Sequence, residues 1–134
     1  MNKIIAILIL LLPISSFGAE LVRLKHAVSV YADGAGVVLK QPEGVDCNDQ
    51  SGFIIADSGN GRLLPYRFEE GIVKPAKEIK IPELSYPVAV KMNSKGEVFA
   101  LEGITRRILR IVSAGAFKGY VDATDLPASA AVMP

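Results

Sequence analysis

Acidic and basic side chains recur on either side of a glycine-containing turn in this chain of 134 residues, and their types and spacing could support chemistry. Asp57 and Arg62 flank the run Ser58-Gly59-Asn60-Gly61. A carboxylate and a guanidinium at this spacing can pair across a hairpin or hydrogen-bond the amides of the turn, or they can line a ligand-binding rim. Glu102 and Arg107 repeat the spacing further along the chain. Because both partners recur, we expect a structural role in which each pair fixes the register of a hairpin.

Catalytic and metal-binding chemistry finds little support among the other polar residues. The run from Asp57 to Gly61 lacks the alternating oxygen ligands and the distal glutamate of a calcium-binding EF-hand loop. No G-x-S-x-G frame surrounds Ser58, and the single histidine, His26, supplies little of a zinc ligand set. We therefore expect no catalytic residue, no metal and no cofactor here. His26 is expected to be a packed, hydrogen-bonded residue of an apolar face.

Cysteine content and charge restrict the partners. Cys47 is the only cysteine, which excludes an internal disulfide. It alternates with Val45 and Asp46 as in a strand, so we expect it to be a small buried hydrophobe rather than a reactive thiol or one that pairs with another chain. Basic and acidic residues number 15 and 14, and loss of Lys3 with a leader would make them equal. No broad electrostatic field favours nucleic acid or an anionic membrane.

The N-terminal 19 residues are typical of a secretory signal peptide. Lys3 precedes the apolar run 4–13, which is too short to cross a bilayer as a helix. Cleavage after Gly18 is favoured over cleavage after Ala19, because the latter places Phe17 where a small side chain is preferred. The alternative is a buried N-terminal helix or a retained anchor. We expect an exported chain, periplasmic or extracellular, with no membrane insertion after the signal is removed.

Two stretches of the chain align without a gap at an offset of 45 residues. The segment Gln41–Tyr66 lies over Tyr86–Ile111. The matched pairs are Pro42 and Pro87, Val45 and Val90, Asn48 and Asn93, Asp57 and Glu102, Arg62 and Arg107, Leu63 and Ile108, and Leu64 and Leu109. A period near this length, built from short strands, is typical of a β-propeller blade.

Strand-like runs rich in Val, Ile, Phe and Tyr alternate with turn residues through both units. The expected strands are 44–48, 53–57, 62–68 and 77–81 in the first unit, and 88–93, 97–102, 106–112 and 117–122 in the second. Asn60-Gly61 should reverse the chain between strands, whereas Gly103-Ile104-Thr105 predicts a turn of different geometry. Residues 20–36 are expected to form one or two strands that could close the last blade of a ring. No helical spacing of apolar residues follows the leader, so the fold class is all-β.

The first unit resembles the NHL-repeat family. Its Pro42-Glu43-Gly44-Val45 is similar to the start of an NHL repeat, and the stretch from Ile55 to Leu63 is similar to the Ala-Asp-x-Gly-Asn-x-Arg-Ile hairpin of that family. The second unit departs from the motif at several positions. The residues that carry the repeat motif are Pro42, Gly44, Asp57, Gly59, Asn60 and Arg62, with Pro87, Glu102 and Arg107 in the second unit. The resemblance implies a β-propeller of four-stranded antiparallel blades, six when complete.

The length of the chain after the leader, divided by the 45-residue offset, allows about two complete blades. We assign 37–82 to the first blade, 83–125 to the second and 126–134 to the start of a third, truncated repeat. The expected partners are therefore the remaining blades of the same chain, or other copies of it that assemble into a ring.

The resemblance implies an exported, non-catalytic scaffold that binds a protein or a small ligand through the loops at one end of the propeller. The alternative is part of a metal-dependent propeller enzyme, a lyase or a lactonase-like hydrolase, whose ligands lie in missing blades. A third possibility is a structural piece that assembles with other chains. Fold alone does not decide among them.

Overall fold

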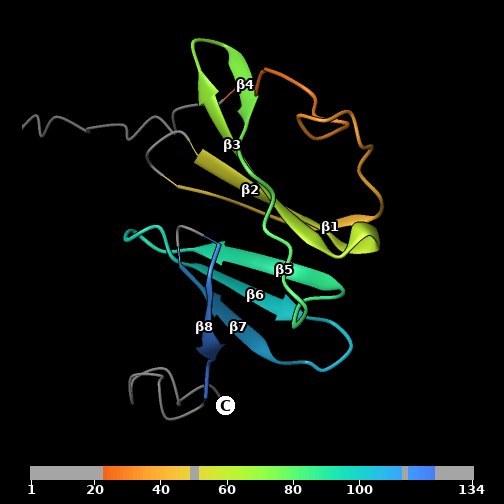
Figure 1. Cartoon of the computed structure of the whole chain (residues 1–134). Helices are drawn as coiled ribbons and strands as arrows, with labels where there is room; N and C mark the ends of the chain where they lie inside the picture. Colours follow the sequence, from red (N-terminus) through yellow and green to blue (C-terminus); the bar gives the residue numbers. More distant parts are fainter. Residues whose placement is uncertain (1–22, 49–51, 113–114, 123–134) are drawn as a thin grey trace, which may run out of the picture.

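The computed structural model describes residues 23–48, 52–112 and 115–122 (Figure 1). Over these residues the chain is all-β, as predicted, and it forms two four-stranded antiparallel sheets in which each strand pairs with the next along the chain. The predicted signal peptide and the start of a third repeat at 126–134 lie outside the described residues. No helix in the described ranges has the length and apolar character needed to cross a membrane.

The first sheet contains β1 (Pro42–Cys47), β2 (Gly52–Asp57), β3 (Arg62–Glu69) and β4 (Ile72–Pro75), and a short 3-10 turn, η1 (Ser58–Asn60), joins β2 to β3. The first three strands lie where they were predicted. The fourth does not, because β3 reverses directly through Glu70 and Gly71, which have φ angles of 52° and 81°. Two left-handed residues form the tight hairpin turn that matches strand twist. Residues 77–81 instead contribute one isolated bridge, between Ile79 and Leu63.

The second sheet repeats the first. It contains β5 (Pro87–Met92), β6 (Val98–Glu102), β7 (Ile108–Ile111) and β8 (Phe117–Tyr120), which agree with the predicted positions. In both sheets the proline that begins the inner strand lies opposite the acidic residue that ends the next one, Asp57 or Glu102. An irregularity follows each proline, between Pro42 and Gly44 and between Pro87 and Ala89. The sequence repeat is therefore a repeat of structure and of register.

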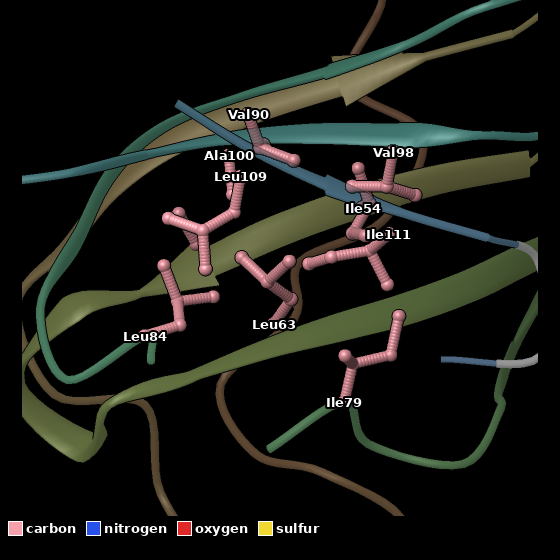
Figure 2. Close-up of a cluster of buried hydrophobic side chains, with 10 residues drawn as sticks. Ile54, Leu63, Ile79, Leu84, Val90, Val98, Ala100, Leu109 and Ile111 are labelled. Carbon is pink, nitrogen blue, oxygen red and sulfur yellow. The ribbon is translucent and has the colours of Figure 1, made fainter. Parts of the chain in front are cut away.

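The sheets pack face to face, closest along β1 and β5, and diverge toward β4 and β8 (Figure 1). Alternate residues of each strand point between them, as the pleat requires. Figure 2 shows the resulting core, in which β2 and β3 face β5, β6 and β7. Its members are Ile54, Ala56, Leu63, Ile79, Leu84, Val90, Val98, Ala100, Leu109 and Ile111. Two stacked four-stranded meanders that spread outward from their first strands have the architecture of neighbouring propeller blades.

The strands expected before the first sheet do not form in the described residues. Residues 23–31 are irregular, and only an isolated bridge joins Ala32 to Val38. A strand is stable only when its backbone groups form hydrogen bonds with a neighbouring strand. In this segment the alternating apolar side chains are not packed against a sheet, and Leu24 is 95% exposed. His26 is also exposed, contrary to expectation, although it does bond the hydroxyl of Ser29 at 3.0 Å.

Cys47 is exposed rather than buried. Side chains alternate between the two faces of β1, as predicted, but this alternation does not determine which face is buried. Asp46 points toward β5, whereas Cys47 shares the opposite face with Val45, which is 66% exposed. No other sheet packs against that part of the face in the described chain, so the thiol reaches solvent.

Candidate functional site

The turn end of the molecule is the end of both sheets that carries the β2–β3 turn (58–61), the β6–β7 turn (103–106) and the connection 76–86 between the sheets (Figure 1). The charged motif residues lie there. Asp57 is fully buried and accepts hydrogen bonds from Arg62 Nε at 2.7 Å, from Asn60 Nδ2 at 2.8 Å and from the Lys40 amide at 2.7 Å. The carboxylate therefore binds both its own hairpin turn and the segment that leads into β1, and the expected pair with Arg62 is present.

Arg62 extends this network to the segment before the first sheet. Its guanidinium donates to Asp33 Oδ2 at 2.5 Å and to Glu78 Oε2 at 3.0 Å. Burial opposes the charge of Arg62, but the carboxylates of Asp57, Glu78 and Asp33 outweigh that cost and raise its pKa above the usual value. The Val37 amide, aided by Arg62, holds the pKa of Asp33 below its ordinary range against the effect of burial. These contacts attach the turn 33–37 to the blade.

Glu102 occupies the position of Asp57 but does not pair with Arg107. It accepts hydrogen bonds from the amides of Ile104 at 2.9 Å, Thr105 at 2.7 Å and Tyr86 at 3.0 Å, and from the Ser85 hydroxyl at 2.9 Å. Burial raises the pKa of Glu102, but these donors more than offset it and leave that pKa below its ordinary value. Of the two expected arrangements, Glu102 therefore takes the one in which the carboxylate binds turn amides, because four donors of the turn and of the segment before β5 occupy it and leave no ion pair with Arg107.

Arg107 has a different partner. Its guanidinium lies 3.2 Å from the centre of the Tyr120 ring, a cation–π contact between β8 and the residue that precedes β7. The side chain is exposed at the surface. Sequence alignment of the two units could not reveal this contact, because Tyr120 lies beyond the matched segments.

The two hairpin turns share a backbone feature that the sequence did not predict. Gly61 has a φ of 62°, and Arg106, at the equivalent place in the second unit, has a φ of 58°. The second turn therefore keeps the left-handed position and places an arginine there. Gly59 is needed for a different reason, because a Cβ at this residue would lie 2.7 Å from Cγ of Lys40 and 2.8 Å from its carbonyl oxygen.

Polar contacts between the sheets were also missed. Asp46 on β1 accepts from the Met92 amide at 2.7 Å and from Lys91 Nζ at 2.8 Å, both on β5. The Tyr86 hydroxyl donates to Glu43 at 2.5 Å. Ser58 donates its hydroxyl proton to the carbonyl oxygen of Pro87. One signal was available, since the 45-residue offset places Asp46 over Lys91 with opposite charge.

The remaining motif residues occupy positions that serve the structure of the sheets. Pro42 and Pro87 begin the inner strands, and Gly44 faces the second sheet, where a Cβ would lie 3.0 Å from the Ala89 Cα. In the described part of the chain, every buried side-chain nitrogen or oxygen has a hydrogen-bond partner. The buried charged motif residues Asp57, Arg62 and Glu102 therefore have their polar groups engaged within the protein.

An open groove lies at the turn end, beside the motif side chains that are already hydrogen-bonded. It has a volume of about 570 Å³ and runs between the β2–β3 turn and the connection to β5. Its lining residues include Lys80 and the apolar residues Ile81, Pro82 and Leu84, of which Leu84 is otherwise buried in the core. Asn60 and Ser85 add polar groups. Among the described residues, no cluster of three or more His, Cys, Asp or Glu side chains could hold a metal ion.

The fold and this end of the molecule define a class: two adjacent blades of the β-propeller type, with loops and an open groove at one end. No protein-family model and no curated protein sequence matches the chain. Among solved structures, it is similar to the selenomethionine-substituted virginiamycin B lyase from Staphylococcus aureus, with a TM-score of 0.48 and 20% sequence identity. The match covers 63% of this chain and 28% of that one. A similarity of this size concerns the path of the backbone and says nothing of what this chain binds or catalyses.

Proposed function

We propose that the chain is an exported propeller scaffold of the NHL-repeat type, which binds a protein or a small ligand at its turn end without catalysing a reaction. The observation that carries this proposal is the groove beside the β2–β3 turn. It combines an apolar lining with the exposed ammonium of Lys80, while the charged motif residues beside it are engaged in internal hydrogen bonds. Grooves with an apolar lining and a few polar groups are the usual form of a ligand site.

The rigidity of the groove walls supports a binding role. The β2–β3 turn is fixed by Asp57 through Asn60 and Arg62, and its Gly59 amide donates to the Lys40 carbonyl at 2.8 Å. On the other wall, Leu84 is buried and its amide donates to the Ile81 carbonyl at 3.1 Å. A site whose walls are already ordered loses little conformational freedom when a ligand binds.

A nuclear magnetic resonance titration tests the proposal. The probes are a set of aliphatic carboxylates of increasing chain length, chosen because the groove pairs apolar side chains with a lysine. We expect amide shift changes in residues 59–61 and 80–85 that grow with chain length. Lys80→Glu should remove them, and Lys118→Glu, which changes an exposed lysine on β8, should not. Shift changes centred elsewhere, or none with any probe, would contradict this site.

A further inference from the structure

The chain enters the first sheet through residues 31–40, which we call the strap and which run from beside β4 to the start of β1 (Figure 1). The strap folds back on itself, because the Leu39 amide donates to the Tyr31 carbonyl at 2.9 Å. Within its turn, the Val37 carbonyl accepts from the Asp33 amide at 3.0 Å, and the Val37 amide donates to Asp33 Oδ1 at 2.9 Å. Local hydrogen bonds therefore hold the strap in its own hairpin shape.

The strap adds no side chain to the hydrophobic core. None of its residues is buried, and three of its apolar side chains reach solvent, with Tyr31 74%, Val37 49% and Val38 67% exposed. Its turn lies against β4, where a Cβ on Gly34 would be 2.8 Å from Cγ of Pro75. A segment with few buried apolar contacts opens at a lower free energy than the strands of a core.

Polar contacts with β3 hold the strap against the first sheet. Arg62 Nη1 donates to Asp33 Oδ2 at 2.5 Å, in an ion pair whose side chains are only 5% and 13% exposed. The Tyr66 hydroxyl adds a neutral hydrogen bond to the Ala32 carbonyl at 3.2 Å. Hydrogen bonds between charged groups contribute more than neutral ones, so the ion pair is the strongest single contact between strap and sheet.

The strap also bonds one wall of the groove at the turn end. The Gly59 amide donates to the Lys40 carbonyl at 2.8 Å, and Asn60 Nδ2 donates to the Val38 carbonyl at 3.0 Å. Gly59 and Asn60 both line the groove. On the opposite wall, the Leu84 amide bonds a carbonyl of its own segment. A closed strap therefore orders the wall that contains the β2–β3 turn.

We propose that the strap opens and closes on the first blade as a unit, that the Asp33–Arg62 ion pair is its latch, and that closure orders the groove wall at residues 59–60. The effect on ligand binding rests on the proposed function of the groove, whereas the opening of the strap does not. A ligand that contacts the ordered wall favours the closed strap, and closure favours the ligand by the same factor.

Hydrogen exchange of the full chain, resolved by residue with nuclear magnetic resonance, tests the latch without a ligand. Two amides report the attachment of the strap: that of Lys40, which donates to Asp57 Oδ1 at 2.7 Å, and that of Gly59. Asp33→Asn removes the charge that faces Arg62 and keeps a side-chain oxygen for the turn. We expect this variant to speed the exchange of both amides roughly tenfold. The amides of β6 should exchange as in the unmodified chain.

Glu78→Gln is the matched control. Glu78 bonds the same Nη1 atom of Arg62 at 3.0 Å, but it belongs to the connection between the sheets and not to the strap. Its replacement should leave the exchange of the Lys40 and Gly59 amides within about twofold of the unmodified rate. Gly34→Val displaces the strap by its close contact with β4 and leaves the latch residues in place. It should speed the same two amides, and it keeps the test decisive if Asp33→Asn does not fold.

Two results would overturn the latch. The first is exchange of the Lys40 and Gly59 amides in the unmodified chain at the same opening free energy as the β6 amides, which would show that the strap opens only with the whole protein. The second is equal acceleration by Glu78→Gln and Asp33→Asn. If the strap opens as expected and the carboxylate probes still do not bind, the latch is supported and the ligand site alone is contradicted.

Discussion

Two residues that occupy equivalent places in the repeat, Arg62 and Arg107, have opposite environments. Arg62 is 4% exposed and bonds three carboxylates, whereas Arg107 is at the surface against an aromatic ring. We therefore expect the same residue type at the same repeat position to contribute differently to stability. The difference arises from what each neighbouring segment supplies: Asp33 and Glu78 to Arg62, and Tyr120 to Arg107.

Replacing these two arginines by methionine should separate the two roles. We expect Arg62→Met to lower the free energy of unfolding by about 3 kcal/mol, because it leaves the buried carboxylate of Asp57 without its cationic partner. Arg107→Met should cost several-fold less, since its contact is exposed. Urea unfolding of both variants measures the difference. Equal losses would show that burial of the ion pair does not govern stability here.

Acid should destabilise the protein through Glu102. Its folded-state pKa lies below the ordinary value of 4.5, so its contribution to stability is complete above that value. The contribution is then lost as the pH falls through the folded-state pKa. Asp33 acts in the same direction.

The acid limb of the stability curve tests this assignment. Between neutral pH and about pH 5 we expect the contribution of Glu102 to be constant, with a loss below that range. Glu102→Gln should lower stability at neutral pH and flatten the acid limb, because the titrating group is gone. Thermal unfolding measured over the pH series reports both effects. An unchanged slope in the variant would show that other groups dominate acid unfolding.

At the scale of elements, the β2–β3 and β6–β7 turns place a left-handed residue at the same repeat position. Gly61 adopts this conformation without a side-chain penalty, whereas Arg106 adopts it at a cost. A Cβ on residue 61 would also lie 2.7 Å from the Ser85 carbonyl oxygen. The first turn therefore has a residue suited to the left-handed conformation, and the second turn does not.

Reciprocal substitutions should have opposite signs. Arg106→Gly is expected to stabilise the protein by about 0.5 kcal/mol. The substitution relieves the strain of the left-handed conformation, and the greater conformational freedom of glycine in the unfolded chain offsets part of that gain. Gly61→Ala should destabilise it by about 1–2 kcal/mol from the left-handed conformation alone, before the close contact is added. Chemical denaturation measures both. Destabilisation by Arg106→Gly would show that the arginine side chain contributes more than its backbone strain costs.

At the scale of the whole molecule, export remains a prediction, because residues 1–19 lie outside the described part of the chain. If the leader is cleaved after Gly18, N-terminal sequencing of the secreted protein should read Ala19 first. Gly18→Leu should slow or displace the cut, because a large side chain is disfavoured beside the cleaved bond. Ser29→Leu, well downstream, is the control and should leave processing unchanged. A protein that retains Met1 would contradict the signal assignment.

Within the described residues, the all-β class, the two four-stranded units and seven of the eight strand positions could be predicted from the sequence, because alternation, turn residues and the internal offset are local properties of the chain. The sequence also placed Asp57 and Arg62 together, since they flank one hairpin. The fourth strand was missed because the short Glu70-Gly71 turn was not recognised as a two-residue hairpin.

The covered face of each strand, and the partner that each charged group takes, depend instead on tertiary packing. Alternation places Cys47 and Asp46 on opposite faces of β1, but the packing of β5 against one of those faces determines that Asp46 is engaged and Cys47 is exposed. Glu102 likewise bonds backbone amides rather than Arg107, because distant segments bring four donors to it. Burial and charge pairing depend on contacts between residues that are far apart in the chain. Local sequence patterns do not indicate which of these residues come into contact.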